Sequence, residues 1–382
     1  MHSKIASLPD VSDAVGSWSA RIGVVRVEYG AGSLDRLGEL VAELGGSRIV
    51  LVTDPGIRAA GHVGRALSAC DGMPLEVFVF DGVEENPTTA HVEAGRAFAA
   101  ERDIDFIVGL GGGSAMDCAK GINFLLTNGG RMEDYRGVGK AAQPMLPSLG
   151  IPTTAGTGSE AQSFALIAQH DTHRKMACGD EKAHFRTVIL DPELAATMPV
   201  SVAVATGLDA ISHALESYVA TTRNPVSQMY AREAWRLLSG NFEAALLEPD
   251  DLARRGSMQI GAYLSGAAIE CSMLGAAHAC ANPLTARFDI THGIAVAAML
   301  PAVIRFNAAA VADLYGELSA ALADTVETLS AAGGRDLRLG ALGVDRDSLP
   351  ALAAEAATQW TAGFNPRPVT EDDLLNLYET SF

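Results

Sequence analysis

The spacing of apolar residues changes half-way along this 382-residue chain, and that change constrains the fold most. Before about residue 200, short apolar runs such as Arg48–Thr53, Phe106–Gly109 and Val188–Leu190 alternate with helical segments. Continuous apolar strands that alternate with helices are typical of a parallel sheet covered on both faces. Further strands are predicted at Ile22–Val27 and Leu75–Phe80, and helices at Ser33–Leu44, Thr89–Arg102 and Ala115–Leu126.

The second half of the chain is rich in Ala and Leu, has helical periodicity and contains no convincing strand. Helices are predicted at Val202–Ala220, Pro225–Leu238, Asp251–Ala268 and Val311–Leu329. Pro192 and Pro199 bracket a short connector between the halves. The sequence therefore predicts an extension over residues 1–20, an α/β domain over 21–195 and an all-helical domain over 196–382.

Charge and cysteine content narrow the class of protein. The net charge of -18 repels phosphate backbones and anionic membranes, so we expect neither nucleic acid nor membrane as a partner. The N-terminal residues lack the apolar core of a signal peptide, and the most apolar stretch, Gly293–Ile304, is too short to span a bilayer. The five cysteines form no C-x-x-C pair, which is typical of reduced thiols in a cytoplasmic protein.

A glycine-rich turn, Gly111-Gly112-Gly113-Ser114, follows one predicted strand and precedes a helix. Glycines let the backbone approach a pyrophosphate, and a helix N-terminus offers free N–H groups to it. A tight structural turn is the alternative. Asp54 ends an earlier strand, where a carboxylate can bind an adenosine ribose and repel a 2′-phosphate, which favours NAD over NADP. It can equally be an ordinary turn residue before Pro55.

The segment Pro152–Glu160 places four hydroxyl side chains and two glycines within nine residues. Hydroxyls and exposed amides suit phosphate and the carboxamide of a nicotinamide. The segment lies between two apolar stretches, which disfavours a flexible linker. We therefore interpret it as part of a nucleotide site.

Four side chains in the helical half form a candidate metal site. Asp209 and His213 lie four residues apart on one helix face, a pair that taken alone is common on any helix. His278 lies in an Ala/Gly-rich helix and His292 at the start of the next, and buried imidazoles need partners. Three imidazoles and a carboxylate suit Zn²⁺ or Fe²⁺. The remaining histidines are interpreted as surface or satisfied residues: His2, His62, His91, His170, His173 and His184.

These motifs together resemble the iron-containing, or group III, alcohol dehydrogenase family over about residues 22–382. The residues that carry the resemblance are Gly111–Ser114 with Asp117 and Lys120, Pro152–Glu160, Gly207-Leu208-Asp209 with His213 and Glu216, His278, His292-Gly293, and Asn365-Pro366-Arg367-Pro368.

The resemblance implies a dehydroquinate synthase-like fold, with an α/β nucleotide domain, an all-α metal-binding domain and an active site in the cleft between them. It implies NAD and one divalent metal, Fe²⁺ foremost with Zn²⁺ as the alternative, and a homo-oligomer of two or more copies. The implied metal ligands are Asp209, His213, His278 and His292. The implied cofactor contacts are Asp54, Gly111, Gly112, Gly113, Ser114, Asp117, Thr153, Thr154, Thr157 and Lys175.

The sequence departs from the family pattern at two positions near the metal. Asn282 stands where many members carry a proton-relay histidine, and Thr291 where a proline often precedes the last ligand. Asparagine can bind a substrate or cofactor but cannot titrate near neutral pH. The predicted activity is hydride transfer between NAD(H) and a small alcohol, aldehyde or ketone. The alternatives are a metal-independent maleylacetate reductase-like enzyme, a dehydroquinate synthase-like lyase, and an NAD- and metal-binding protein with impaired catalysis.

Overall fold

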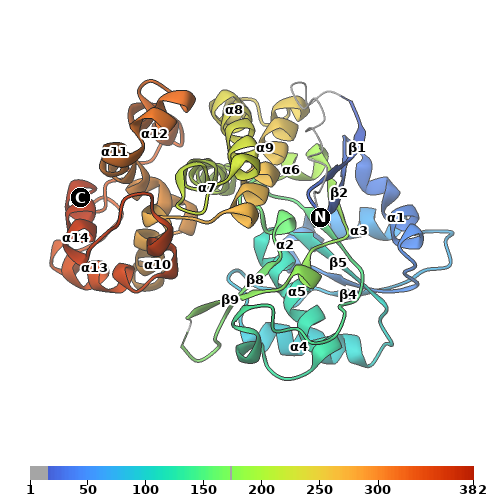
Figure 1. Cartoon of the computed structure of the whole chain (residues 1–382). Coiled ribbons are helices and arrows are strands. Elements are labelled where there is room, and N and C mark those ends of the chain that lie inside the picture. Colours follow the sequence, from blue (N-terminus) through green and yellow to red (C-terminus); the bar gives the residue numbers. More distant parts are fainter. Residues whose placement is uncertain (1–15, 173) are drawn as a thin grey trace. The chain divides into compact units, whose positions relative to one another are not determined.

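The computed structural model describes residues 16–172 and 174–382, which form two compact units (Figure 1). The first unit runs up to Thr154 and then from Ser159 to Met198; the second comprises Ala155–Gly158 and Pro199–Phe382. Most of the predicted extension, residues 1–15, lies outside the described residues, as does His173. Its last residues, 18–20, belong to the first strand.

The first unit contains a seven-stranded sheet in the order β1-β2-β10-β7-β5-β3-β4. Only β1 is antiparallel to its neighbour, and the other pairs are parallel. A second sheet has the order β6-β9-β8. The strands are β1 (Trp18–Ile22), β2 (Val25–Tyr29), β3 (Arg48–Val52), β4 (Glu76–Phe80), β5 (Phe106–Gly111), β6 (Gly137–Val138), β7 (Ser148–Pro152), β8 (Phe164–Ala168), β9 (Lys175–Gly179) and β10 (Thr187–Leu190).

Helices cover both faces of the large sheet, as its continuous apolar strands require. One face packs against α1, α3 and α6 through a core that includes Leu37, Val63 and Leu194. On the other face, a Cβ at Gly109 would lie 3.3 Å from Ala119 Cβ, so this glycine lets α5 pack close to β5. The helices of this unit are η1 (Ser33–Arg36), α1 (Leu37–Glu43), α2 (Pro55–Ala59), α3 (His62–Ser68), α4 (Thr89–Ala100), α5 (Gly113–Asn128), η2 (Met132–Tyr135), η3 (Ser159–Ala161), η4 (Glu181–Ala183) and α6 (Pro192–Ala196).

The single strand predicted over residues 22–27 is wrong, because the chain reverses there. Ile22 ends β1 and pairs with Val25, the first residue of β2, so Gly23 and Val24 form a two-residue hairpin turn. Gly23 has φ +60°, the left-handed conformation that such turns need. Val24 is exposed, although its apolar side chain extends the apparent strand in the sequence.

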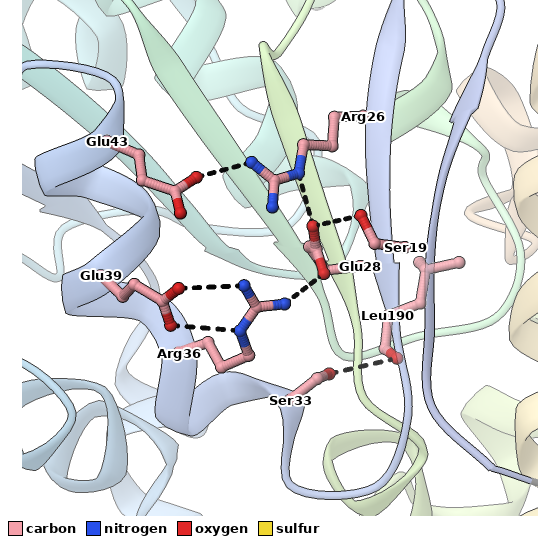
Figure 2. A network of polar contacts seen from close by, with 8 residues as sticks. All are labelled: Ser19, Arg26, Glu28, Ser33, Arg36, Glu39, Glu43 and Leu190. Atoms are coloured by element: carbon pink, nitrogen blue, oxygen red, sulfur yellow. Dashed lines mark hydrogen bonds and ion pairs between the residues drawn. The ribbon is translucent and has the colours of Figure 1, made fainter.

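A buried carboxylate on β2 ties the hairpin to the neighbouring helix (Figure 2). Glu28 is only 2% exposed and accepts hydrogen bonds from Ser19 Oγ at 2.6 Å, Arg26 Nε at 2.5 Å and Arg36 Nη1. The two guanidinium groups continue outward to exposed Glu43 and Glu39. Burial of this charge is therefore compensated entirely within the unit.

The carboxyl ends of three neighbouring strands bring the predicted nucleotide residues together. β5 lies between β3 and β7 and runs parallel to both, so the three strands end at one edge of the sheet. Asp54 lies just beyond β3, the glycine-rich turn ends β5, and Thr153 follows β7. Ligands of open α/β sheets bind outside this edge.

The second unit is helical, and in its described residues no strand follows β10. Its elements are α7 (Val200–Val219), α8 (Pro225–Leu247), α9 (Leu252–Cys271), α10 (Ala276–Phe288), α11 (His292–Leu318), α12 (Leu322–Ala332), η5 (Arg346–Ser348), α13 (Leu349–Ala357), η6 (Trp360–Phe364) and α14 (Glu371–Thr380). α7 packs against α8, α9 and α11 and is buried almost throughout its length. The predicted combination of an α/β sheet unit and a helical unit is confirmed.

α11 is longer than the apolar stretch noted in the sequence. With 27 residues it is long and apolar enough to cross a membrane, and the pair α9 and α10, bent by 107°, passes the same test as one broken span. However, 61% of the most apolar window of α11 is buried inside the protein, as in the core helix of a soluble protein. The sequence argued against a membrane span from the shortness of the apolar stretch, whereas the structure argues against it from the burial of α11. The helix therefore does not suggest a membrane protein.

Candidate metal centre and nucleotide site

α7 presents three polar side chains along one of its faces. Asp209, His213 and Glu216 are spaced by four and then three residues, which places them one above the other on a helix. All three are buried, at 5% exposure each. A helix of otherwise apolar side chains thus directs a carboxylate, an imidazole and a second carboxylate into one buried region.

The other two histidines lie at the starts of α10 and α11. His278 lies in the first turn of α10, and His292 is the first residue of α11. Gly293 lets α11 approach α7: a Cβ at this glycine would lie 1.9 Å from the carbonyl oxygen of Ala205 and 3.1 Å from Asp209 Cβ. No side chain fits there, which explains why glycine follows His292.

The ligand atoms of the four predicted residues gather around Asp209 Oδ1. This oxygen lies 3.5 Å from His213 Nε2, 3.6 Å from His278 Nε2 and 4.0 Å from His292 Nε2. Two ligand atoms bound tetrahedrally to one ion at metal–ligand distances of about 2.1 Å lie about 3.4 Å apart. The spacing therefore suits a single cation. Asp209, His278 and His292 each offer a ligand atom within 4.8 Å of the other two. His213 is not part of that group of three, but its Nε2 lies 3.5 Å from Asp209 Oδ1 and its ring stacks on that of His278 with centroids 4.9 Å apart.

The electrostatics of this cluster favour a positive charge. Burial alone would raise the pKa of Asp209, but the imidazoles of His213, His278 and His292 outweigh it and hold the pKa well below its usual range. Burial alone would lower the pKa of His278, yet its contacts with Asp209 and Glu216 raise it to about 9. At His213 burial prevails and lowers the pKa. The two carboxylates thus stabilise a cation against the cost of desolvation.

The surroundings of two polar atoms at the centre of the cluster show whether a metal fits. Asp209 Oδ1 and His278 Nε2 are buried and make no hydrogen bond, although buried polar atoms usually do. Their separation of 3.6 Å is too long for a good hydrogen bond but suitable for two ligands of one ion. The other imidazole nitrogen of His278, Nδ1, lies 2.6 Å from Glu216 Oε2. The residues present therefore fit a divalent cation.

The predicted nucleotide residues of the first unit lie around the glycine-rich turn. Gly111 has φ +149°, and a Cβ there would lie 3.3 Å from Asp54 Oδ2, so one carboxylate oxygen of Asp54 faces the turn. The other oxygen, Oδ1, accepts a hydrogen bond from Ile57 N and caps α2. Thr153 N donates to Gly111 O, and a Cβ at Gly112 would lie 3.5 Å from Thr154 Cγ2. Asp54 thus has a capping role whether or not it also binds a ribose.

Residues 152–160 do not stay in one unit. Thr153 and Thr154 belong to the first unit, whereas Thr157 lies in the short stretch that packs with the second. Gly158, at φ +62°, contacts Gly266 of α9 so closely that neither position has room for a Cβ. A Cβ at Gly156 would lie 2.4 Å from Thr206 Cβ of α7, so both glycines of this segment serve helix packing, a reason that the sequence alone did not reveal.

Beneath the glycine-rich turn lies a buried charged group that sequence reasoning did not interpret. Lys120 is 2% exposed, and its Nζ donates to the carbonyl oxygens of Ser159, Gln162 and Phe164 at 2.6–2.8 Å. Burial raises the pKa of Asp117 to about 6, against the attraction of Lys120. Asp117 thus lies within the protein rather than on the surface of the turn, whereas Lys175 is exposed at the start of β9.

Asn282 lies one helical turn after His278 on α10 and is half-buried. Its Nδ2 donates to Gln359 Oε1 at 3.0 Å, a partner that lies far away in the sequence. Of the other histidines, His62 is buried and bonded to Thr197 at 2.7 Å, and His91 accepts from Thr88 N at 3.0 Å. All five cysteines are free.

Fold and site together define a class of oxidoreductases that combine a nucleotide-binding sheet with a metal-binding helical unit. Two family models match this chain: "Iron-containing alcohol dehydrogenase" over residues 25–192 and "Fe-containing alcohol dehydrogenase family, C-terminal" over residues 203–382. The chain belongs to the iron-containing alcohol dehydrogenase family.

Individual relatives match over nearly the whole chain. The 1,3-propanediol dehydrogenase of Klebsiella pneumoniae is 31% identical, covering 93% of this chain and 96% of the relative. The NAD-dependent methanol dehydrogenase of Bacillus methanolicus is 30% identical, covering 92% and 97%. The structure of sulfoacetaldehyde reductase from Bifidobacterium kashiwanohense in complex with NAD⁺ has a TM-score of 0.86 at 25% identity, covering 96% of this chain and 99% of that one.

The predictions of family, fold class and enzyme class are confirmed by these matches. The chain is an NAD-linked oxidoreductase of a metal-dependent, alcohol dehydrogenase type. The ligand and cofactor residues named from the sequence stay predictions, as do the substrate, the identity of the metal and the number of subunits.

Proposed function

We propose that this chain is a cytoplasmic NAD-dependent dehydrogenase of small alcohols whose divalent metal, Fe²⁺ foremost, is held by Asp209, His213, His278 and His292. The observation that carries the proposal is Asp209 Oδ1, which is buried, makes no hydrogen bond and faces three imidazole nitrogens within 4.0 Å. A carboxylate in that setting needs a cation. Zn²⁺ suits the same donor set.

The proposed reaction depends on a bound metal and NAD and on side chains of this chain. A divalent metal held by these residues would supply a Lewis acid for the substrate oxygen, and bound NAD(H) would supply or take up the hydride. Asp209 neutralises charge at the site, and Glu216 hydrogen-bonds the ligand His278. Asn282 cannot carry a proton, because a carboxamide does not titrate near neutral pH. The proton of the alcohol would therefore have to leave by a route other than a histidine at this position.

For the nucleotide we propose residues 21–195 as the binding domain. The proposed contacts lie at the strand ends that carry Asp54, Gly111–Ser114 and Thr153–Thr154. Thr157, Lys175 and the buried Asp117 complete the proposed set. The Asp54 oxygen that faces Gly111 supports a preference for NAD, because a carboxylate there would repel a 2′-phosphate. Residues 196–382 form the proposed metal-binding domain, and we propose a homodimer or larger assembly.

The substrate is proposed only as a class. The named relatives act on a diol, on methanol and on a sulfonated aldehyde, so the family accepts short substrates of different polarity. We propose a short alcohol, diol or aldehyde. The clustered ligand set supports this metal-dependent reaction over the maleylacetate reductase-like alternative, which needs no such cluster.

The test is a panel of short alcohols, diols and aldehydes assayed with NAD(H) and NADP(H). The protein is first stripped with a chelator and then reconstituted anaerobically with Fe²⁺ or with Zn²⁺. We expect turnover to disappear on chelation, to return with metal and to favour NAD. Full activity after chelation would support the metal-independent alternative, and bound NAD without net NADH formation would support the lyase or the impaired protein.

A further inference from the structure

The first turn of α10, which carries His278, is held by side chains from distant parts of the second unit. Its N-cap residue, Gly275, has no side chain with which to cap the free N–H groups of the turn. Two remote side chains replace it. Ala276 N donates to Asn365 Oδ1 at 3.2 Å, and Ala277 N donates to Glu216 Oε1 at 2.7 Å.

Gly275 is itself required by this arrangement. A Cβ at this position would lie 2.9 Å from Asn365 Oδ1 and 3.1 Å from Glu216 Oε1. Both distances are tighter than ordinary contacts, so a side chain would displace one of the two capping groups. The glycine, the carboxylate and the amide therefore form one packed unit around the start of α10.

Asn365 uses its full hydrogen-bonding capacity there. Its Oδ1 accepts from Ala276 N and from Asn307 Nδ2, and its Nδ2 donates to Asn307 Oδ1 at 2.7 Å and to Arg367 O at 2.6 Å. An amide offers two donors and two acceptor sites, and all four are occupied. This accounts for Asn365 in the Asn365-Pro366-Arg367-Pro368 motif as a structural cap of α10.

Glu216 differs from Asn365 because it also contacts a ligand. Its side chain is 4% exposed, and Oε2 lies 2.6 Å from His278 Nδ1 while Oε1 is taken by the helix N-terminus. A carboxylate has only acceptors, so His278 Nδ1 must carry the proton of this bond. In the neutral imidazole, the form that can bind a metal, the lone pair of His278 is thereby left on Nε2, the atom that faces Asp209 Oδ1 at 3.6 Å.

We infer that Glu216 is a positioning residue that fixes the tautomer and ring orientation of His278 for metal binding. The inference rests on the proposed metal site. Carboxylate partners of metal-bound histidines raise the basicity of the ligand and hold its ring, and their loss typically lowers metal affinity about 10–100-fold. Glu216 does both, and its second oxygen ties the orientation of the ring to the start of the helix that carries it.

The test compares Glu216→Gln with Asn365→Ala in metal titrations of the stripped protein, with Zn²⁺ and Co²⁺ as the probes. The glutamine keeps the size of the side chain and one acceptor, so it can still cap α10. We expect Glu216→Gln to lower metal affinity about 10–100-fold. The melting temperature of the metal-free protein should also fall, because the buried bond to His278 loses its charged partner. Asn365→Ala, which removes the cap at Ala276 N together with the hydrogen bonds to Asn307 and Arg367, should lower that melting temperature and reduce metal affinity less.

Unchanged metal affinity in Glu216→Gln would overturn the positioning role and leave the proposed function intact. If the wild-type protein binds neither Zn²⁺ nor Co²⁺, both fail together. If a variant does not fold, a measurement on the wild-type protein alone still tests the inference. In Co²⁺-loaded protein, proton NMR should show a metal-shifted histidine N–H signal that exchanges slowly with solvent, because Glu216 holds it. Absence of that signal would also overturn the inference.

Discussion

Two buried carboxylates, Glu28 in the first unit and Asp209 in the second, have opposite surroundings. Glu28 is 2% exposed and is bonded to two guanidinium groups and a hydroxyl (Figure 2). Asp209 is 5% exposed, and in the described part of the chain its only ion-pair partners are the imidazoles of His213, His278 and His292. Arginine is always charged near neutral pH, whereas imidazole is charged only when protonated.

The difference separates a structural ion network from a ligand site. Guanidinium groups cannot bind a metal, so Glu28 is complete as soon as the chain folds. Imidazoles are both bases and metal ligands, so the charge of Asp209 is best balanced by an external cation. A buried acid surrounded by arginines therefore indicates stability, and one surrounded by histidines indicates binding.

Replacing Asp209 should give the largest effect. In Asp209→Asn the side chain keeps its size but loses the charge that the three imidazoles face, so we expect metal affinity to fall more than about 100-fold, since loss of even an outer-shell partner costs about 10–100-fold. Turnover should fall with it. The melting temperature of the wild-type protein should rise with added metal, and that of the variant should not. A variant that binds metal and turns over like the wild type would remove the contrast with Glu28.

Replacing Glu28 should lower the stability of the protein and leave its metal affinity unchanged. Glu28→Gln leaves two guanidinium groups beside a neutral amide, and loss of one partner of a buried pair costs several kcal/mol. Arg26 and Arg36 are 32% and 39% exposed and can be hydrated, so we expect a smaller loss of about 2 kcal/mol in the free energy of unfolding. Urea denaturation measures this loss, and metal titration should show unchanged affinity. Weakened metal binding in this variant would mean that the two carboxylates are coupled.

The arrangement of strands and helices was largely predictable, because periodicity records which faces of an element are buried. The apolar run Arg48–Thr53 and the helix of Asp209 and His213 fall close to β3 and α7. The hairpin at Gly23 was not predictable in this way. Its turn lacks the Asn-Gly or Asp-Gly pair that signals a two-residue loop, and the apolar Val24 made the two strands look like one.

The candidate site was predictable in composition but not in its supports. Histidines in apolar helices are unusual enough to identify the three imidazoles from sequence. The role of Glu216 was open to the same reasoning, since it lies seven residues after Asp209 on the same face of α7. Asn365 and Gln359 could not be paired with α10, because contacts between residues distant in the chain leave no local pattern.

Gly293 is the third position that tests this comparison, and it links local packing to the Asp209 site. A Cβ there would lie 1.9 Å from Ala205 O and 3.1 Å from Asp209 Cβ, so Gly293→Ala must push the start of α11 away from α7. Overpacking of this kind costs about 1–3 kcal/mol, and His292 should move away from Asp209. We expect a lower melting temperature together with weaker metal binding. The matched control is Gly316→Ala in the part of α11 beyond its kink at Val311, where no atom lies within 4 Å of the added Cβ and alanine should be neutral or stabilising by up to about 1 kcal/mol. If Gly293→Ala loses stability but keeps wild-type metal affinity, the position of His292 does not depend on this close approach.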